Sequence, residues 1–474
     1  MDKFFILNEL KEIKKLLALQ KEILTLDEFC TYASISKPLL SGKIEFKKRK
    51  EAIKASFLVI FSLPQPKIAM SKGSFFTGQP IFNQILSFIP RSLVSRIARE
   101  SGSDRYCKSL KSYDHLVTML YATFNRCTSL REVTTGMLAW EHRIAHLGMK
   151  SHPRRSTLSD ANSRRSEQVF EQIYLGLLDQ YRSVLPDSRK RSKKNNLYIF
   201  DSTSIALFQE ILKGSGLRRS DGKNKGGIKV HTLLNSGQDV PVMIRYSPAA
   251  DNDVRFLKEV KLNAGSVIVF DRGYCDYRTY NRFTSDRVTF VTRKLNRSVY
   301  QIDEQRTVSE EQIKQGVLSD CNITLGYTYL KKAVQVRARL VRFKDPVTQK
   351  EFEFITNNRR LRAITVANYY RQRWQIETFF KRIKQNYELQ YFLGDNANAI
   401  KIQIWCALIA DLILKVIRKG SKSKMAFSNL TGLVRLHLMT YLDLNAFLKW
   451  PEKSLLNKIQ QQKQVLQPPN LFKT

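Results

Sequence analysis

The chain has 474 residues, with 80 lysines and arginines against 42 aspartates and glutamates, which leaves a formal net charge of +38. Hydrophobic residues make up 43% of the chain, so a mainly disordered protein is excluded and two or three globular domains are expected. The excess of positive charge favours a polyanionic partner. The most favoured partner is nucleic acid, which includes RNA packed as in ribosomal proteins. A membrane surface is the second candidate.

Cysteine usage and hydropathy exclude further classes. The chain has six cysteines but no CxxC motif and no Cys/His cluster, which argues against structural zinc and favours a reducing compartment. The first fifteen residues alternate charged and apolar residues, so no signal peptide is expected. The most apolar predicted helix, 402–417, carries Asp411 and Lys415 and is too short for a membrane span. We therefore expect an intracellular protein without a membrane partner.

Residues 1–69 form a basic segment that fits no complete domain pattern. The stretch 25–40 resembles the start of an excisionase-type helix-turn-helix, but Pro38 falls where the second helix should begin. We hypothesise that 1–69 is an appended or read-through segment and that the functional body begins near Met70. The alternative is a small accessory DNA-binding arm.

Residues 70–190 are predicted to form an all-helical domain. Glycines and prolines mostly separate its helical patterns. Several polar faces are basic, so we assign the domain to DNA binding, with coverage of the core as the alternative. The predicted helices are 80–88, 92–99, 113–124, 129–140, 155–162 and 168–181.

After a basic linker over 186–196, the pattern changes to strands. The predicted order is three strands, a helix, a strand, a helix and a strand, at 197–200, 228–235, 240–247, 252–262, 267–270, 276–285 and 288–293. This order predicts an α/β fold with a ribonuclease-H-like core, in which parallel strands extend three antiparallel ones. The first part of the core covers 191–294.

The rest of the chain completes this core. Residues 295–350 alternate apolar and polar residues and suggest an inserted β-rich sheet. The last part of the core, 351–420, begins with a strand pattern at 352–357 and contains the helix discussed next. Residues 421–474 are predicted to be C-terminal helices and a polar tail.

The stretch 369–384 contains no glycine or proline and reads as one amphipathic helix. Its polar face carries Arg373, Glu377 and Lys384, with Tyr370 at the edge. Taken alone, this face is ordinary: an Arg–Glu pair at i,i+4 is common on a solvated helix.

Two aspartates upstream change that interpretation. Asp201 and Asp271 each follow an apolar strand, and these two strands are neighbours in the ribonuclease-H order. Glu377 would supply a third carboxylate at the same place. Three converging carboxylates need cations, and two Mg²⁺ ions about 4 Å apart would serve, one to activate water or a 3′-hydroxyl and one to stabilise the leaving oxygen. Arg373 and Lys384 would hold phosphates.

These residues resemble a known family. Tyr370-x2-Arg373-x3-Glu377-x6-Lys384 resembles the Y-R-E-K signature of the DDE transposases of the insertion-sequence-four family. Asp201 in IFDST and Asp271 in VFDRGY resemble its first two acidic motifs. The segment 227–231 resembles the motif between them, and the β-rich insertion is also a family trait. The resemblance covers 75–414.

The resemblance implies cut-and-paste transposition: metal-dependent cleavage of double-stranded DNA at transposon terminal inverted repeats, through a hairpin, and strand transfer into target DNA. It implies Mg²⁺, for which Mn²⁺ can substitute, a DNA-bridged homodimer, and a cytoplasmic, nucleoid-associated bacterial protein. The expected catalytic and metal-binding residues are Asp201, Asp271 and Glu377. The expected contacts to terminal phosphates are Tyr370, Arg373 and Lys384.

Further DNA contacts are predicted around this site. Trp374 either stacks on a base or packs in the core. The basic, glycine-rich loop 213–229 is expected to follow the DNA backbone, with Arg218, Arg219 and Lys229 as contacts. The alternative for Lys229 and His231 is a plain pairing of strands. The alternative for the loop 213–229 is a solvated loop. His231 and Arg272 are further candidates near the site.

Two other functions stay open at this stage. One is a ribonuclease-H-like nuclease that cuts without joining, which would not need Arg373 and Lys384. The other is a catalytically inactive DNA-binding derivative, against which the presence of all three carboxylates argues.

Overall fold

The computed structural model describes residues 78–185, 196–206, 217–218, 224–225, 227–249, 253–329 and 332–465. The segment hypothesised to be appended, 1–69, lies outside the described residues, and so does most of the basic loop 213–229. The chain from Phe75 to Thr474 forms one compact unit, so the helical region and the sheet belong to the same body.

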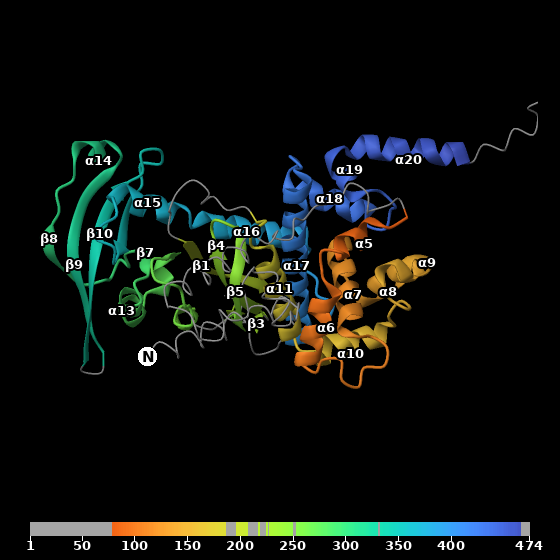
Figure 1. The fold of residues 1–474 in the computed structure, drawn as a ribbon. Helices are drawn as coiled ribbons and strands as arrows, with labels where there is room; N and C mark the ends of the chain where they lie inside the picture. Colours follow the sequence, from red (N-terminus) through yellow and green to blue (C-terminus); the bar gives the residue numbers. More distant parts are fainter. Residues whose placement is uncertain are drawn as a thin grey trace, which may run out of the picture. The chain divides into compact units, whose positions relative to one another are not determined.

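The main sheet of this body has nine strands in the order β5-β4-β1-β6-β7-β11-β10-β9-β8, and the end formed by β10, β9 and β8 lies away from the N-terminal helices (Figure 1). A separate two-stranded sheet pairs β2 with β3. The strands are β1 (Leu197–Ala206), β2 (Leu217–Arg218), β3 (Asn224–Lys225), β4 (Gly227–Asn235), β5 (Val240–Pro248), β6 (Val267–Phe270), β7 (Thr289–Arg293), β8 (Tyr300–Gln305), β9 (Val317–Tyr329), β10 (Lys332–Lys344) and β11 (Glu351–Thr356).

The strand pairing in the first part of the core is the predicted one. Strands β1, β4 and β5 pair antiparallel in that order, while β6 is parallel to β1 and β7 is parallel to β6. All four residues of β6 are buried, as expected for a parallel strand covered on both faces. The neighbouring positions of β1 and β6 decide where the two aspartates lie.

The β-rich insertion differs from the expectation of an inserted sheet of its own. Strand β11 pairs with β7 on one side and with β10 on the other, so β10, β9 and β8 extend the main sheet. A short helix, α14 (Glu310–Lys314), connects β8 to β9. The edge strand β8 was not predicted, because five of its six residues are exposed and it lacks an alternating apolar pattern.

The helices of residues 78–185 pack on helices from the C-terminal end of the chain. The first group is α5 (Ile81–Leu86), α6 (Arg91–Glu100), α7 (Ser112–Asn125), α8 (Leu130–Leu138), α9 (Glu141–Ile144), the 3-10 helix η1 (Ala145–Leu147), α10 (Arg155–Arg164) and α11 (Gln168–Tyr181). The second group is α17 (Ala397–Ser421), α18 (Phe427–His437), α19 (Leu444–Lys449) and α20 (Pro451–Val465). The buried Gln84 side chain joins the groups by donating to the Leu442 carbonyl at 2.6 Å and accepting from the Leu444 amide at 2.8 Å.

The long helix α17 lies between the sheet and the N-terminal helices (Figure 1). It contacts α7, α10 and α11, and nearly all its side chains up to Ile417 are buried. This burial on all sides explains its continuous apolar sequence. None of the helices in the described part of the chain has the length and apolarity needed to cross a membrane.

The remaining helices flank the sheet. They are α12 (Val254–Leu257), the 3-10 helix η3 (Arg272–Tyr274), α13 (Tyr277–Ser285), α15 (Ala363–Arg371) and α16 (Trp374–Asn386). Helix α12 is much shorter than the predicted 252–262. Phe256 and Leu257 are buried in α12, while Val260 is buried after the helix has ended.

Candidate active site

The register between β1 and β6 brings the two aspartates together. Phe200 pairs with Phe270 as the last paired residues of these strands, so Asp201 and Asp271 are the next residues on each. The prediction that Asp201 ends its strand is wrong, because β1 continues to Ala206 and pairs Asp201 with Thr232 of β4. The aspartates therefore lie where the parallel strands separate, which is the edge expected for them.

The predicted single helix over 369–384 is divided into α15 and α16, with Gln372 and Arg373 between them. Tyr370 lies at the end of α15, where its hydroxyl donates to Asp271 Oδ1 at 3.0 Å. The phenol is buried, and burial raises the pKa of Tyr370 well above its usual value, with a further rise from the charge of Asp271. Tyr370 is therefore a neutral donor that fixes one oxygen of Asp271.

Arg373 lies between the other two carboxylates. Its Nη1 is 3.0 Å from Asp201 Oδ2, and its Nη2 donates to Glu377 Oε1. The Arg–Glu pair predicted as an ordinary surface pair is thus present, but the Arg373 side chain is only 14% exposed and also binds Asp201. Arg373 lies at the junction between α15 and α16 and links Glu377 to Asp201 by binding both carboxylates.

A four-membered ion network holds α16 in this position. Arg382 of α16 pairs with Asp239 of the β4–β5 turn at 2.7 Å and with Asp411 of α17 at 3.3 Å. Lys415 of α17 pairs with the same two aspartates at 3.0 and 2.9 Å. Asp411 and Lys415, the charged residues within the apolar sequence of α17, therefore help to hold the helix that carries Glu377 in place.

The environment of Asp201 favours its protonated form. Burial raises the pKa of Asp201 to about 6, the Ser202 amide and Arg373 oppose this rise, and the charges of Asp271 and Glu377 add to it. Tyr274 also donates its hydroxyl to Asp201 at 3.5 Å. Sequence reasoning missed Tyr274, although it stands three residues after Asp271 in the VFDRGY motif.

The raised pKa predicts how stability depends on pH. A carboxyl whose pKa is higher in the folded chain stabilises the fold at low pH and loses that contribution as pH rises through the folded-state pKa. In EDTA, wild type is therefore expected to lose about 2–3 kcal/mol relative to Asp201→Asn between pH 4 and pH 6. Urea denaturation measures this difference. A difference between wild type and Asp201→Asn that stays flat from pH 4 to pH 6 would show that the pKa of Asp201 is not raised.

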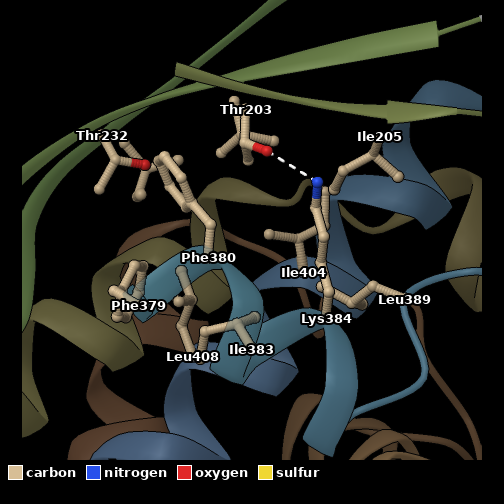
Figure 2. Close-up of a pocket in the computed structure, with 12 residues that line it drawn as sticks. Thr203, Ile205, Thr232, Phe379, Phe380, Ile383, Lys384, Leu389, Ile404 and Leu408 are labelled. Atoms are coloured by element: carbon tan, nitrogen blue, oxygen red, sulfur yellow. Dashed lines mark hydrogen bonds between the residues drawn. The ribbon is translucent and has the colours of Figure 1, made fainter. Parts of the chain in front are cut away.

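Lys384 contacts β1 in the structure. Its ammonium donates to Thr203 Oγ1 at 2.7 Å and to the Ser204 carbonyl at 3.0 Å. Figure 2 shows the ammonium pointing at Thr203 beside a small apolar cavity, which is lined mainly by residues of β1, β4, β5, α16 and α17. Burial lowers the pKa of Lys384. Thr203 stands two residues after Asp201 on the same face of β1, so Lys384 lies along the same side of the sheet as the carboxylates.

Lys229 binds Asp253, a residue that sequence reasoning did not select, while His231 lies near Asp253 and hydrogen-bonds Ser247 through Nε2 at 2.8 Å. Lys229 Nζ is 2.7 Å from Asp253 Oδ1, and the buried His231 stacks on Phe256 with its Nδ1 3.9 Å from the same oxygen. Asp253 also accepts from Ser202 Oγ at 3.2 Å. Side chains alternate along β1, so this polar cluster lies on the face of the sheet opposite Asp201.

The other predicted contacts have different surroundings. Trp374 is 64% exposed, which excludes the core-packing alternative, and its ring lies 5.7 Å from the Arg373 guanidinium. Arg272 donates to Asn296 at 3.2 Å. The structure describes Arg218 only as a backbone position in β2, and Arg219 lies outside the described residues.

Three carboxylates at one sheet edge are a donor set suited to a hard divalent cation. Their charges reach one another, since Asp271 and Glu377 both raise the pKa of Asp201. In the described part of the chain, however, no three His, Cys, Asp or Glu side chains are close enough to hold a metal ion together. The three carboxylates are chemically suited to such an ion, but the Arg373 guanidinium lies between two of them, those of Asp201 and Glu377.

Comparison with known proteins places the chain in a class and a family. Residues 192–412 match the transposase DDE domain, and residues 77–150 match a domain of unknown function, DUF4372. The protein is thus a transposase. A putative transposase, y4zB, of Sinorhizobium fredii is 30% identical over 284 residues, which are 60% of this chain and 76% of that protein. The chain belongs to the DDE transposase family, whose members cleave and join DNA strands and generally use divalent metal ions.

Two further similarities were found. A putative transposase for the insertion sequence element IS4SA of Synechocystis is 26% identical over 273 residues, covering 55% of this chain and 71% of that protein. The structure of a piggyBac transposase synaptic complex with hairpin DNA is similar at a TM-score of 0.39 and 11% identity, over 84% of this chain and 86% of that one.

Proposed function

We propose that this transposase cleaves DNA at the ends of its own element and transfers the strands into target DNA at the edge of a ribonuclease-H-like core. The observation that carries the proposal is the juxtaposition of Asp201 and Asp271 at paired strand positions, with Glu377 linked to Asp201 through Arg373. The strand order β5-β4-β1-β6-β7, antiparallel and then parallel, supports the assignment of the core.

Asp201, Asp271 and Glu377 would hold the divalent cations, with two Mg²⁺ ions as the proposed complement and Mn²⁺ as a substitute. When bound, such ions activate a water or 3′-hydroxyl and stabilise the leaving oxygen of the phosphodiester. The chain's own residues keep the carboxylates in place. Tyr370 fixes Asp271, and the Arg382–Asp411 contact fixes the helix that carries Glu377.

The DNA is proposed to lie across the face of the sheet that carries the carboxylates. Arg373 and Tyr370 would meet the terminal phosphates, and the exposed Trp374 ring would stack on a base. The loop 213–229, including Arg218 and Arg219, would follow the backbone. Lys229 would do so only by leaving Asp253, so the plain strand pair is favoured for Lys229 and His231.

The helices of the region 70–190 are proposed to bind the element's ends, and a homodimer to bridge two ends, with cleavage through a hairpin. We also propose that residues 1–69 are an appended segment. The double-stranded DNA partners would be the terminal inverted repeats and the target. A protein with this substrate and bacterial relatives would act in the cytoplasm at the nucleoid.

Strand joining distinguishes this function from that of a simple nuclease. A linear duplex carrying the inverted repeat that flanks the gene should be cut by the chain in Mg²⁺ but not in EDTA. With a target plasmid present, the cut end should be joined to it, and a duplex with a shuffled repeat should be neither cut nor joined. Cutting without joining would favour the nuclease, and neither reaction would favour an inactive derivative.

Lys384→Ala is expected to weaken binding of the end duplex and to lower the slope of log affinity against log salt by about one. The reason is that the ammonium lies on the carboxylate side of β1 and can exchange Thr203 for a phosphate. Fluorescence anisotropy over a salt series measures the slope. Lys381→Ala, on an exposed position of the same helix, is the matched control. An unchanged slope for Lys384→Ala would remove it from the DNA contacts.

A further inference from the structure

The guanidinium of Arg373 lies between two carboxylates and binds both of them, as a shared metal cation would. One nitrogen of its fork meets Asp201 at 3.0 Å and the other meets Glu377. The width of the guanidinium keeps these carboxylates apart, whereas ligands of one Mg²⁺ ion approach it to about 2.0–2.1 Å. The absence of a three-residue metal cluster among the described residues agrees with this spacing. Arg373 and a metal ion therefore need the same place.

The Arg373 guanidinium also lacks one of its hydrogen-bond partners in this position. Its Nε is buried and has no hydrogen-bond acceptor among the described residues. The side chain starts from the junction between α15 and α16 and lies beside the exposed ring of Trp374, so open surface is close to it. A phosphate oxygen could provide the missing acceptor, because phosphate accepts from arginine as readily as carboxylate does.

We propose that Arg373 is a built-in counter-cation that competes with divalent metal for Asp201 and Glu377, and that it releases them when it turns to a DNA phosphate. This inference rests on the proposed function, because it takes these carboxylates as the metal ligands. In the DNA-free chain the arginine stabilises carboxylates that would otherwise repel each other at a partly buried site. In the DNA complex the same residue contacts the strand.

Competition of this kind couples the two ligands. A phosphate that draws Arg373 away frees two carboxylates, so DNA should increase the affinity for metal, and metal should increase the affinity for DNA by the same factor. The chain would then assemble a complete metal site mainly where a DNA strand is present.

The test is Mn²⁺ binding to the DNA-free, full-length chain, followed by electron paramagnetic resonance. Arg373→Gln is expected to bind Mn²⁺ at least about tenfold more tightly than wild type, since one opposite charge at this range changes a carboxyl equilibrium by about ten- to a thousandfold. Arg96→Gln is the matched control, because Arg96 forms an exposed i,i+4 pair with Glu100 at 3.7 Å. It should bind Mn²⁺ like wild type.

Two more variants separate the inference from the site assignment. Arg373→Lys keeps the charge but cannot bridge two acids, so it should bind Mn²⁺ with an affinity between those of wild type and Arg373→Gln, even if the glutamine variant folds poorly. Asp201→Asn should weaken binding in either background. If Asp201→Asn weakens binding while both Arg373 variants bind no more tightly than wild type, the inference is overturned and the site stands. If Asp201→Asn changes nothing, the proposed site itself is overturned.

Discussion

Asp271→Ala is expected to lower Mg²⁺-dependent cleavage of an end-carrying duplex by more than about a hundredfold, because even outer-shell partners of a metal ion contribute about 10–100-fold. In EDTA, where no metal contributes, binding of the duplex should stay nearly unchanged, since the substitution removes a negative charge and no donor to phosphate. Gel analysis of cleavage and anisotropy of binding measure the two effects separately.

The variant also leaves Tyr370 without its acceptor. The phenol is 9% exposed, so the loss should destabilise the fold by about 1–3 kcal/mol, and a thermal melt must show that the variant is folded. Asp286→Ala, at the exposed end of α13, controls for the loss of a carboxylate elsewhere. Cleavage retained by Asp271→Ala would remove this residue from the active site.

The largest effect on stability is expected at Arg339. This side chain of β10 is almost completely buried and binds both oxygens of Asp320, at 2.8 and 2.6 Å, and the carbonyl of Leu361 ahead of α15. Arg339→Ala leaves Asp320 buried without its main partner, which typically costs about 3–5 kcal/mol. Chemical denaturation should show this loss.

Two companion variants test the cause. Arg342→Ala on the same strand breaks only exposed ion pairs with Glu351 and Glu353, so it should cost less than about 1 kcal/mol. Replacing both Arg339 with Met and Asp320 with Leu should recover most of the loss, because apolar residues can substitute for a buried pair. A small effect of Arg339→Ala would show that Arg306, 3.6 Å from Asp320, suffices as its partner.

Much of the core could be predicted because its signals are local. The apolar run of β6 is bounded and fully buried, and the order of strands and helices determined which strands pair. The helix 369–384 was drawn as continuous because neither glycine nor proline marks Gln372 and Arg373. The break coincides instead with two tertiary contacts: Tyr370 donates to Asp271, and Arg373 donates to Asp201.

The site could be predicted only as a set of residue types. The expected neighbouring of two strands indicated that Asp201 and Asp271 could meet, and the family resemblance supported Glu377 as the third carboxylate. Neither indicated that Arg373 would lie between two of them. Asp253 and Tyr274 were missed because their partners are distant in sequence. The strand at 352–357 was predicted as part of the core, but the extension of the main sheet into the insertion depends on the pairing of β11 with β7, which lie far apart in the chain.

A crystal of the chain with its end duplex, grown in Mn²⁺ and measured at the manganese absorption edge, tests the central claim most directly. The expected result is anomalous density bound by Asp201 together with Asp271 and Glu377, with the Arg373 guanidinium on a DNA phosphate. Manganese bound elsewhere, or Arg373 still lying between Asp201 and Glu377 beside the bound DNA, would contradict it.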